Sequence, residues 1–433
     1  MENCLPPANE YHASLHLYLS ENKLLSLNAF LIAEDFQRLG FLPIWSSTKH
    51  FSVPAAQSPL QFSGAHIASG NHDSFAFLNF KEVFRNTISH AGISVARGQA
   101  FDHSELVEAR AFALTIDGPI VIKPTHGNKG RGATIGLTDM NLFEEAFAYA
   151  KSVRSKTSKI LIEEQFTNCA ELRLLVIEGQ CVGVVRRIPP RVLGDRQATI
   201  AELIARTNIR KRTNPNECTL ALKLNSHRRH LLAKQGYTEQ SVPASGVWVK
   251  IDDLGNISEG ADSYECKELV HSGYIEIAEK VAKMAAPVVV VGVDMLVRNI
   301  KEAPTADNYI VIEANSGPAI TGHTYPTYGK AADIVEPTID YCFEHAELDY
   351  GFDGILDVRV EVLNANPQVT FEARQHFRQL CQQYQGLGVS LQERRNAFYV
   401  QASHSKLRSI TRLFEQKFGR ETTALCFFSD SEA

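Results

Sequence analysis

The segment from Pro119 to Leu137 constrains the fold more than any other part of this chain. A β-branched run ends at Lys123, a loop rich in glycine and basic residues follows, and a second β-branched run begins at Thr134. This order predicts a strand, a glycine-rich loop and a second strand. Glycines let the backbone approach a polyphosphate closely, and successive N–H groups form an anion-binding concavity. We therefore expect this loop and the Lys123 ammonium to contact phosphates.

The loop matches neither of the two common phosphate motifs. In the Walker motif the lysine follows the glycines and opens a helix, whereas Lys123 precedes them. In the dinucleotide fingerprint a helix follows the loop, whereas a strand is predicted here. A glycine-rich hairpin with solvated charges is the alternative interpretation of this stretch alone.

Length and charge narrow the class of protein. The 433 residues predict about three domains. The net charge of -5 provides no basic field for nucleic acid. The N-terminal residues lack the pattern of a signal peptide, and the apolar run Ala285–Val293 is too short to span a bilayer. The eight cysteines show no CxxC spacing, so we expect neither a metal cluster nor a disulfide framework. A cytoplasmic protein without a nucleic-acid or membrane partner is expected.

The predicted elements alternate between strands and helices, which indicates an α/β (α+β) protein. Residues 1–100 are predicted to form an α/β layer, and residues 101–348 a larger domain. Residues 352–433 are predicted to fold as a ferredoxin-like βαββαβ unit, because two helical patterns alternate with four strand patterns. Two β-branched runs, Val288–Val297 and Tyr309–Glu313, are predicted to pair as a hairpin.

Acidic residues in strand patterns suggest a metal site. Asp294 lies within a buried strand pattern, and Glu313 and Asn315 are two apart, so they point to one face. Such oxygen ligands suit Mg²⁺. The alternative is that both carboxylates simply pair with arginines or helix N-termini.

Two further clusters accompany the loop. The strand pattern Ile160–Glu164 runs into an irregular segment whose backbone can read an adenine edge, and Glu171 can accept from ribose hydroxyls; the alternative is a solvated edge strand. Arg173 and Arg187 lie on adjacent predicted strands and can stabilise a phosphate and a tetrahedral intermediate. Their alternative is a surface cation pair.

Together these residues resemble the ATP-grasp ligases, over about residues 20–345, and most closely the ligase domains of cyanophycin synthetases and bifunctional glutathione synthetases. Lys123–Gly132 resembles their Lys-Pro-x-x-Gly-Asn-x-Gly-Arg-Gly. The run from Arg187 to Asp195 resembles their Arg-Val-Pro-Ala-Asn-Val-x-Gly-Asp, although Pro190 and Arg191 replace Ala-Asn. The substrates of these relatives are therefore not carried over. The resemblance implies an ATP-grasp fold that follows an N-terminal pre-ATP-grasp α/β layer.

The resemblance also implies a role for each matching residue. Arg85, where such enzymes usually have lysine, and Lys123 would hold the nucleotide phosphates. The remaining implied contacts are the phosphate loop with Gly127, Lys129, Gly130 and Gly132; the adenine border with Glu164, Gln165 and Thr167; the ribose contact Glu171; the catalytic residues Arg173, Arg187 and Lys123; and the ligands Asp294, Glu313 and Asn315 of two Mg²⁺ ions, for which Mn²⁺ is a possible substitute.

The implied activity is an ATP-dependent carboxylate–amine ligase that acts on amino acids or a small peptide. ATP would convert a carboxylate to an acyl phosphate, and an amine would displace phosphate to leave an amide. The alternative is a non-catalytic ATP-binding regulatory or scaffold protein. A D-alanine–D-alanine-type ligase is the other enzyme considered, but that group usually has an arginine where this chain has Gly292. Homo-oligomerisation, through residues 352–433 for example, is left open.

Overall fold

The computed structural model describes residues 5–11, 14–56, 58–68, 71–125, 132–153, 159–346, 348, 354–394, 397–419 and 421–428. The chain forms two compact units, each assembled from separated segments. The first unit comprises Met1–Ala68, Pro189–Ser263 and Ala319–Ala433, and the second comprises Ser69–Ile188 and Tyr264–Pro318. Among the described residues, no helix has the length and apolar character needed to cross a membrane. The predicted three-domain boundaries stay a prediction.

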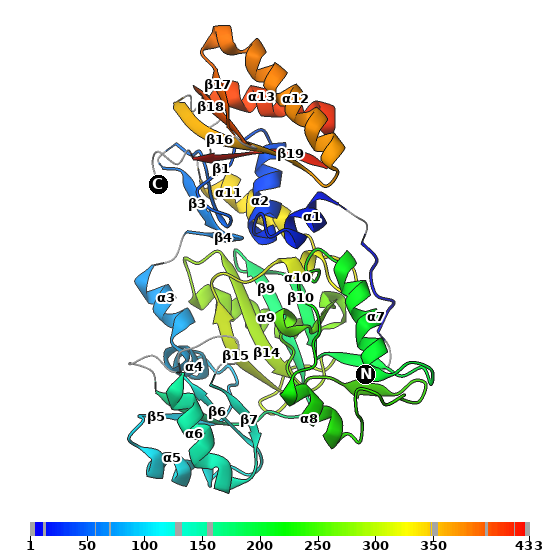
Figure 1. Ribbon diagram of the computed structural model, residues 1–433. Coiled ribbons are helices and arrows are strands. Elements are labelled where there is room, and N and C mark those ends of the chain that lie inside the picture. The colour runs from blue at the N-terminus through cyan, green and yellow to red at the C-terminus, as the bar shows by residue number, and fades with distance from the viewer. Residues whose placement is uncertain are drawn as a thin grey trace. The chain divides into compact units, whose positions relative to one another are not determined.

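The second unit contains a central sheet with the strand order β13-β10-β9-β14-β15. Figure 1 labels β9, β10, β14 and β15 of this sheet. Antiparallel pairing joins β9 to both β10 and β14, and β14 to β15. The hairpin predicted from the two β-branched runs is thus confirmed. The strands are β9 (Ala170–Ile177), β10 (Gln180–Ile188), β13 (Asp262–Glu265), β14 (Val290–Val297) and β15 (Tyr309–Asn315). Within β13 the chain passes from the first unit to the second.

One face of the central sheet is apolar. Alternate residues of β9, Leu172, Leu174 and Val176, are buried in a core shared with helix α9 (Ser272–Met284). Side chains in a strand alternate between faces, so the residues between them point to the opposite side. That opposite face carries the polar side chains that form the candidate site.

A small antiparallel sheet with the order β5-β8-β6-β7 completes the strands of the second unit. The predicted strand–loop–strand is the β6–β7 pair, and residues 126–131 of its loop lie outside the described residues. Helices α5 and α6 share its apolar core. The elements are β5 (Gly98–Phe101), α5 (Leu106–Ala113), β6 (Ile120–Pro124), β7 (Thr134–Leu137), η1 (Met140–Leu142), α6 (Phe143–Ser152) and β8 (Ile160–Glu164).

Two helices begin the second unit. Helix α3 (His72–Asn79) starts with a reciprocal capping box between Asn71 and Ser74. Helix α4 (Lys81–His90) buries Phe84 and Ile88. Both helices contact β15. Lys81 and Arg85 are four residues apart on α4, so the helix presents their side chains on one face.

The first unit contains a mixed sheet with the order β17-β18-β16-β19-β1-β2-β3-β4. Helices α12 and α13 share a core with β16 to β19 (Figure 1). Strand β19 also pairs in parallel with β1, a contact that the sequence did not predict. The elements are β1 (Ile44–Trp45), β2 (His50–Val53), β3 (Leu60–Ser63), β4 (His66–Ile67), β16 (Ile355–Asn364), α12 (Pro367–Gln383), η4 (Gln385–Leu387), β17 (Ser390–Arg394), β18 (Ala397–Ser403), α13 (His404–Phe418) and β19 (Thr422–Phe428).

The rest of the first unit is helical with short strands. A buried ion network joins its segments: the Lys211 ammonium lies 3.0 Å from a carboxylate oxygen of Asp262, and Glu217 accepts from Thr327. Burial raises the pKa of Glu217. The elements are α1 (Leu15–Glu21), α2 (Leu27–Arg38), β11 (Arg191–Leu193), α7 (Ile200–Thr213), α8 (Ser226–Lys234), β12 (Trp248–Lys250), η2 (Ile257–Glu259), α10 (Thr321–Thr324) and α11 (Val335–His345); η3 (Lys267–Leu269) lies in the second unit.

Candidate active site

Three charged residues stand in a row across the polar face of the central sheet. Asp294 on β14 lies directly opposite Glu313 on β15 and, on its other side, opposite Arg173 on β9. Residues opposed in this way have neighbouring side chains on the same face. Asn315 lies opposite Gly292, two residues along each strand. The structure therefore brings together Asp294, Glu313 and Asn315, which the sequence pattern grouped into one predicted metal site.

Asp294 is a buried carboxylate held by two arginines. Only 3% of the residue is exposed. The Arg173 guanidinium donates to both of its oxygens, with Nη2 2.7 Å from Oδ2, and Nη1 of Arg187 lies 3.4 Å from Oδ2. Burial alone would raise the pKa of Asp294, but the two guanidinium charges outweigh it and hold the pKa below its usual value. Asp294 is thus ionised at neutral pH.

Glu313 is paired with a cation from outside the sheet. Its Oε2 lies 2.6 Å from the Lys81 ammonium of α4. The Asn315 amide donates to the other oxygen at 3.4 Å. Two carboxylates and an amide oxygen on one face are the donor set that Mg²⁺ takes in proteins, so these residues fit a magnesium site. Asp294 also pairs with arginines, as the alternative interpretation expected, and Glu313 pairs with a lysine. The roles of Asp294, Glu313 and Asn315 as metal ligands therefore stay predictions.

Arg173 and Arg187 lie on adjacent strands, as predicted, because β9 pairs with β10. Their side chains are 13% and 18% exposed and both contact carboxylates, so the surface-pair alternative is wrong. Arg187 also donates to Glu171, the predicted ribose contact. Burial and the nearby Asp294 charge raise the pKa of Glu171, although Arg187 opposes them.

A second cluster joins the small sheet to α4. The buried carboxylate of Glu163 on β8 forms ion pairs with both Lys123 on β6 and Arg85 on α4. Burial would raise the pKa of Glu163, but the Lys123 and Arg85 charges hold it below its usual value. The structure thus brings the two predicted phosphate cations together on one carboxylate. Glu163 itself was missed, because its contact with Arg85 depends on α4, which is distant in the sequence.

The predicted adenine border lies where β8 ends. Glu164 is exposed, and Gln165 and Thr167 are half-buried. The backbone N–H of Glu164 donates to the Arg97 carbonyl at 2.8 Å, and that of Gln165 to the Pro119 carbonyl at 2.9 Å. These two N–H groups are therefore used within the fold. The adenine contact stays a prediction that depends on the remaining groups.

The phosphate loop is described only at its ends. The predicted contacts Gly127, Lys129 and Gly130 lie outside the described residues. Gly132 has φ +75°, which L side chains rarely adopt, and a Cβ there would come within 3.2 Å of Pro124. Glycine at this position is thus required by the local backbone.

A profile of the carbamoyl-phosphate synthase L chain ATP binding domain matches residues 81–221. That range includes Lys81, Arg85, Lys123, Glu163 and both arginines of the central sheet. The chain is similar to ATP-grasp proteins over this range. The ATP-grasp resemblance drawn from the glycine loop and its companion clusters is confirmed.

Curated relatives of this chain include ligases. The chain is 32% identical to the cyanophycin synthetase of Geminocystis herdmanii over 61% of its own length and 30% of that enzyme. It is 31% identical to the glutathione biosynthesis bifunctional protein GshAB of Clostridium perfringens, over 61% of its own length and 34% of that protein. The chain thus spans about a third of the length of these relatives.

A solved structure supports the fold. The bifunctional glutathione synthetase of Pasteurella multocida superposes with a TM-score of 0.56 at 24% identity, covering 74% of this chain and 44% of that one. This likeness concerns the fold alone.

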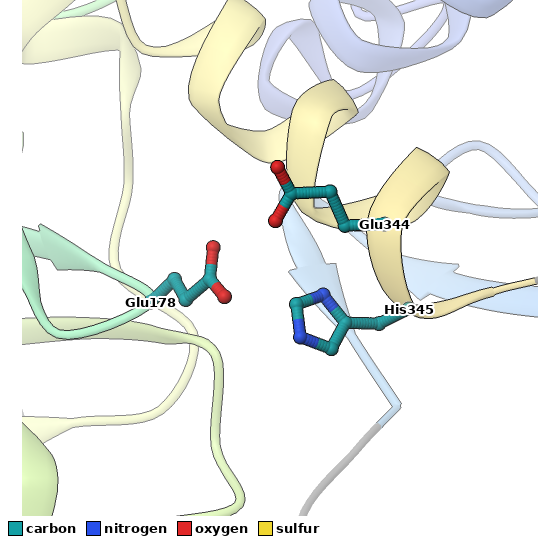
Figure 2. Close-up of side chains that lie close together, drawn as sticks. All are labelled: Glu178, Glu344 and His345. Atoms are coloured by element: carbon teal, nitrogen blue, oxygen red, sulfur yellow. The ribbon is translucent and has the colours of Figure 1, made fainter.

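Two acidic residues and a histidine are drawn together in Figure 2. Glu344 and His345 end α11 in the first unit, whereas Glu178 follows β9 in the second. All three are exposed. Since they belong to different units, we assign no metal site to them.

Proposed function

We propose that this protein is an ATP-dependent carboxylate–amine ligase that forms an amide bond and releases ADP and phosphate. The observation that supports this most directly is the polar face of the central sheet, where Asp294, Glu313 and Arg173 stand in register. Oxygen donors and an arginine side by side suit a reaction that develops negative charge on phosphoryl and acyl oxygens. The cyanophycin synthetase and GshAB similarities support the same reaction class.

Each cluster has a separate task in this proposal. Lys123 and Arg85 bind the nucleotide phosphates, while Glu163 holds these two side chains in place. Asp294, Glu313 and Asn315 would hold divalent cations, two Mg²⁺ ions for which Mn²⁺ could substitute, and these would supply neutralisation of phosphate charge. Arg173 and Arg187 bind the oxygens of the substrate carboxylate as it is phosphorylated and then attacked.

The chemistry runs in two balanced steps. An oxygen of the substrate carboxylate attacks the γ-phosphorus of ATP, the bond to the bridging oxygen breaks, and ADP leaves. The amine nitrogen then attacks the acyl carbon, the bond between that carbon and the phosphate oxygen breaks, phosphate leaves with this oxygen, and the amine loses a proton. The protein contributes mainly position and charge, since no protein nucleophile is needed.

We also propose that β16 to β19, with α12 and α13, form a ferredoxin-like unit. The chain order is βαββαβ, and the sheet order β17-β18-β16-β19 supports the split arrangement. Its parallel contact with β1 supports a unit that is continuous with the N-terminal strands rather than separate from them.

Phosphate release from ATP and Mg²⁺ across a matrix of amino acids and short peptides, offered singly and in pairs, tests the ligase. The expected result is release that requires a carboxylate and an amine together, with a product whose mass equals their sum minus water. Release that is equal with either substrate alone, without a condensed product, would contradict the proposal.

A further inference from the structure

Lys81 connects the two clusters of the site. It lies at the start of α4, one turn before Arg85, and its ammonium is 2.6 Å from Glu313 of the central sheet. Arg85, on the same helix face, reaches Glu163 of the small sheet. One helix thus supplies a cation to an acidic residue of each sheet. Sequence reasoning did not select Lys81, although its spacing of four residues from Arg85 was a usable signal.

The charge of Lys81 acts on three carboxylates. Besides its contact with Glu313, it lowers the pKa of both Asp294 and Glu163, although Arg173 and Lys123 are the stronger influences on these two. The Lys81 side chain is 19% exposed and that of Glu313 34%. An ion pair that is partly buried interacts more strongly than a fully exposed surface pair. Lys81 is therefore well placed to compensate the acidic row.

We propose that Lys81 is a positioning residue that occupies Glu313 in the nucleotide-free protein and so makes divalent-cation binding depend on nucleotide. The inference rests on the proposed function, in which Glu313 is a metal ligand. A carboxylate that is neutralised by an ammonium attracts a second cation less strongly. A polyphosphate gives Lys81 other anionic oxygens, and Glu313 becomes available when the nucleotide arrives.

Binding of Mn²⁺ alone tests this inference, with free Mn²⁺ followed by electron paramagnetic resonance in the full chain. We expect Lys81→Met to bind Mn²⁺ about fivefold more tightly than the wild type without nucleotide, because one competing charge is removed. With ADP present the difference should shrink, so the effect of ADP on Mn²⁺ affinity falls by a similar factor. Misfolding would weaken Mn²⁺ binding, so tighter binding is not explained by a structural defect.

Two matched variants control for charge. Lys81→Arg keeps the cation and should retain the wild-type Mn²⁺ affinity. Lys283→Met removes an exposed lysine from α9, the helix on the apolar face of the central sheet, and should also leave the Mn²⁺ affinity unchanged. Lys81→Gln repeats the test with an uncharged polar side chain. Unchanged or weaker nucleotide-free binding in both Lys81→Met and Lys81→Gln overturns the inference.

Glu313→Gln separates this inference from the proposed function. If this variant weakens Mn²⁺ binding in the presence of ADP while Lys81→Met fails to tighten it, only the role of Lys81 is wrong. If Glu313→Gln leaves Mn²⁺ binding unchanged in the presence of ADP, the metal assignment itself fails, and the inference fails with it.

Discussion

Asp294 and Glu313 face each other directly across the β14–β15 hairpin. Like charges opposed in a sheet repel, and here cations flank the pair on both sides, Arg173 for Asp294 and Lys81 for Glu313. Such an arrangement offsets the repulsion between two neighbouring carboxylates. In the proposed function both side chains are metal ligands.

Glu313→Gln should reduce turnover at least about a hundredfold while the fold is retained, because it removes one charge from the oxygen donor set and changes little volume. Phosphate release in the presence of an active substrate pair measures the loss, and far-ultraviolet circular dichroism checks the fold. Glu276→Gln, on the exposed side of α9, is the matched control and should keep full activity. Retained turnover in Glu313→Gln at ordinary Mg²⁺ would show that Glu313 is not a ligand.

Arg173→Met should destabilise the protein by about 3 kcal/mol, because the buried Asp294 carboxylate loses its bidentate partner. Urea unfolding measures this change. Arg206→Met provides the control, because Arg206 is 62% exposed and its pair with Asp195 contributes little. A destabilisation equal to that of the control would mean that Arg187 alone can compensate Asp294.

Gly292→Ala should destabilise the protein by about 2 kcal/mol through overcrowding. A Cβ at this position would come within 2.7 Å of the Pro318 Cβ and 3.1 Å of the Arg173 Cδ. The substitution should also slow turnover, because Arg173 would have to move away from Asp294. Gly386→Ala is the matched control, as a Cβ there meets nothing within 4 Å. Thermal unfolding distinguishes the two, and equal midpoints would contradict the prediction.

Glu415 on α13 should make stability depend on pH. Burial raises its pKa from 4.5 to about 7. The folded state therefore keeps a proton that the unfolded state releases, so stability falls as the pH rises from about 4.5 to about 7, by about 3 kcal/mol in all. Glu415→Gln should remove this loss and be the more stable form at pH 8.

Urea unfolding at pH 5 and pH 8 measures that difference. Glu372→Gln, an exposed position on α12, is the control and should follow the wild type at both values. If Glu415→Gln loses as much stability as the wild type between the two pH values, the pH dependence of stability comes from another group.

The sequence predicted the strands that carry the site better than the contacts these strands make with distant segments. The β-branched runs around Asp294 and Glu313 predicted the β14–β15 hairpin, because a local alternation of strand, polar loop and strand leaves few other pairings. Glu163 was missed because its role depends on α4, which lies far away in the sequence, and no pattern within β8 reports that contact.

The first-unit sheet shows the same limit. The four C-terminal strands follow a recognisable local order, whereas the parallel pairing of β19 with β1 joins strands from opposite ends of the chain. Parallel strands cannot be joined by a tight hairpin turn and need a long connection, so no short-range signal predicts such a neighbour.

The β1–β19 pairing has a consequence for biosynthesis. Residues of the second unit are all made before β19, so that unit has its whole sequence available while the partner of β1 is still missing. During translation the edge of β1 that will pair with β19 stays unpaired until β19 has been made. An unpaired strand edge can pair with other chains. Ribosome-bound nascent chains that end before residue 422 should therefore need chaperone protection for their N-terminal strands.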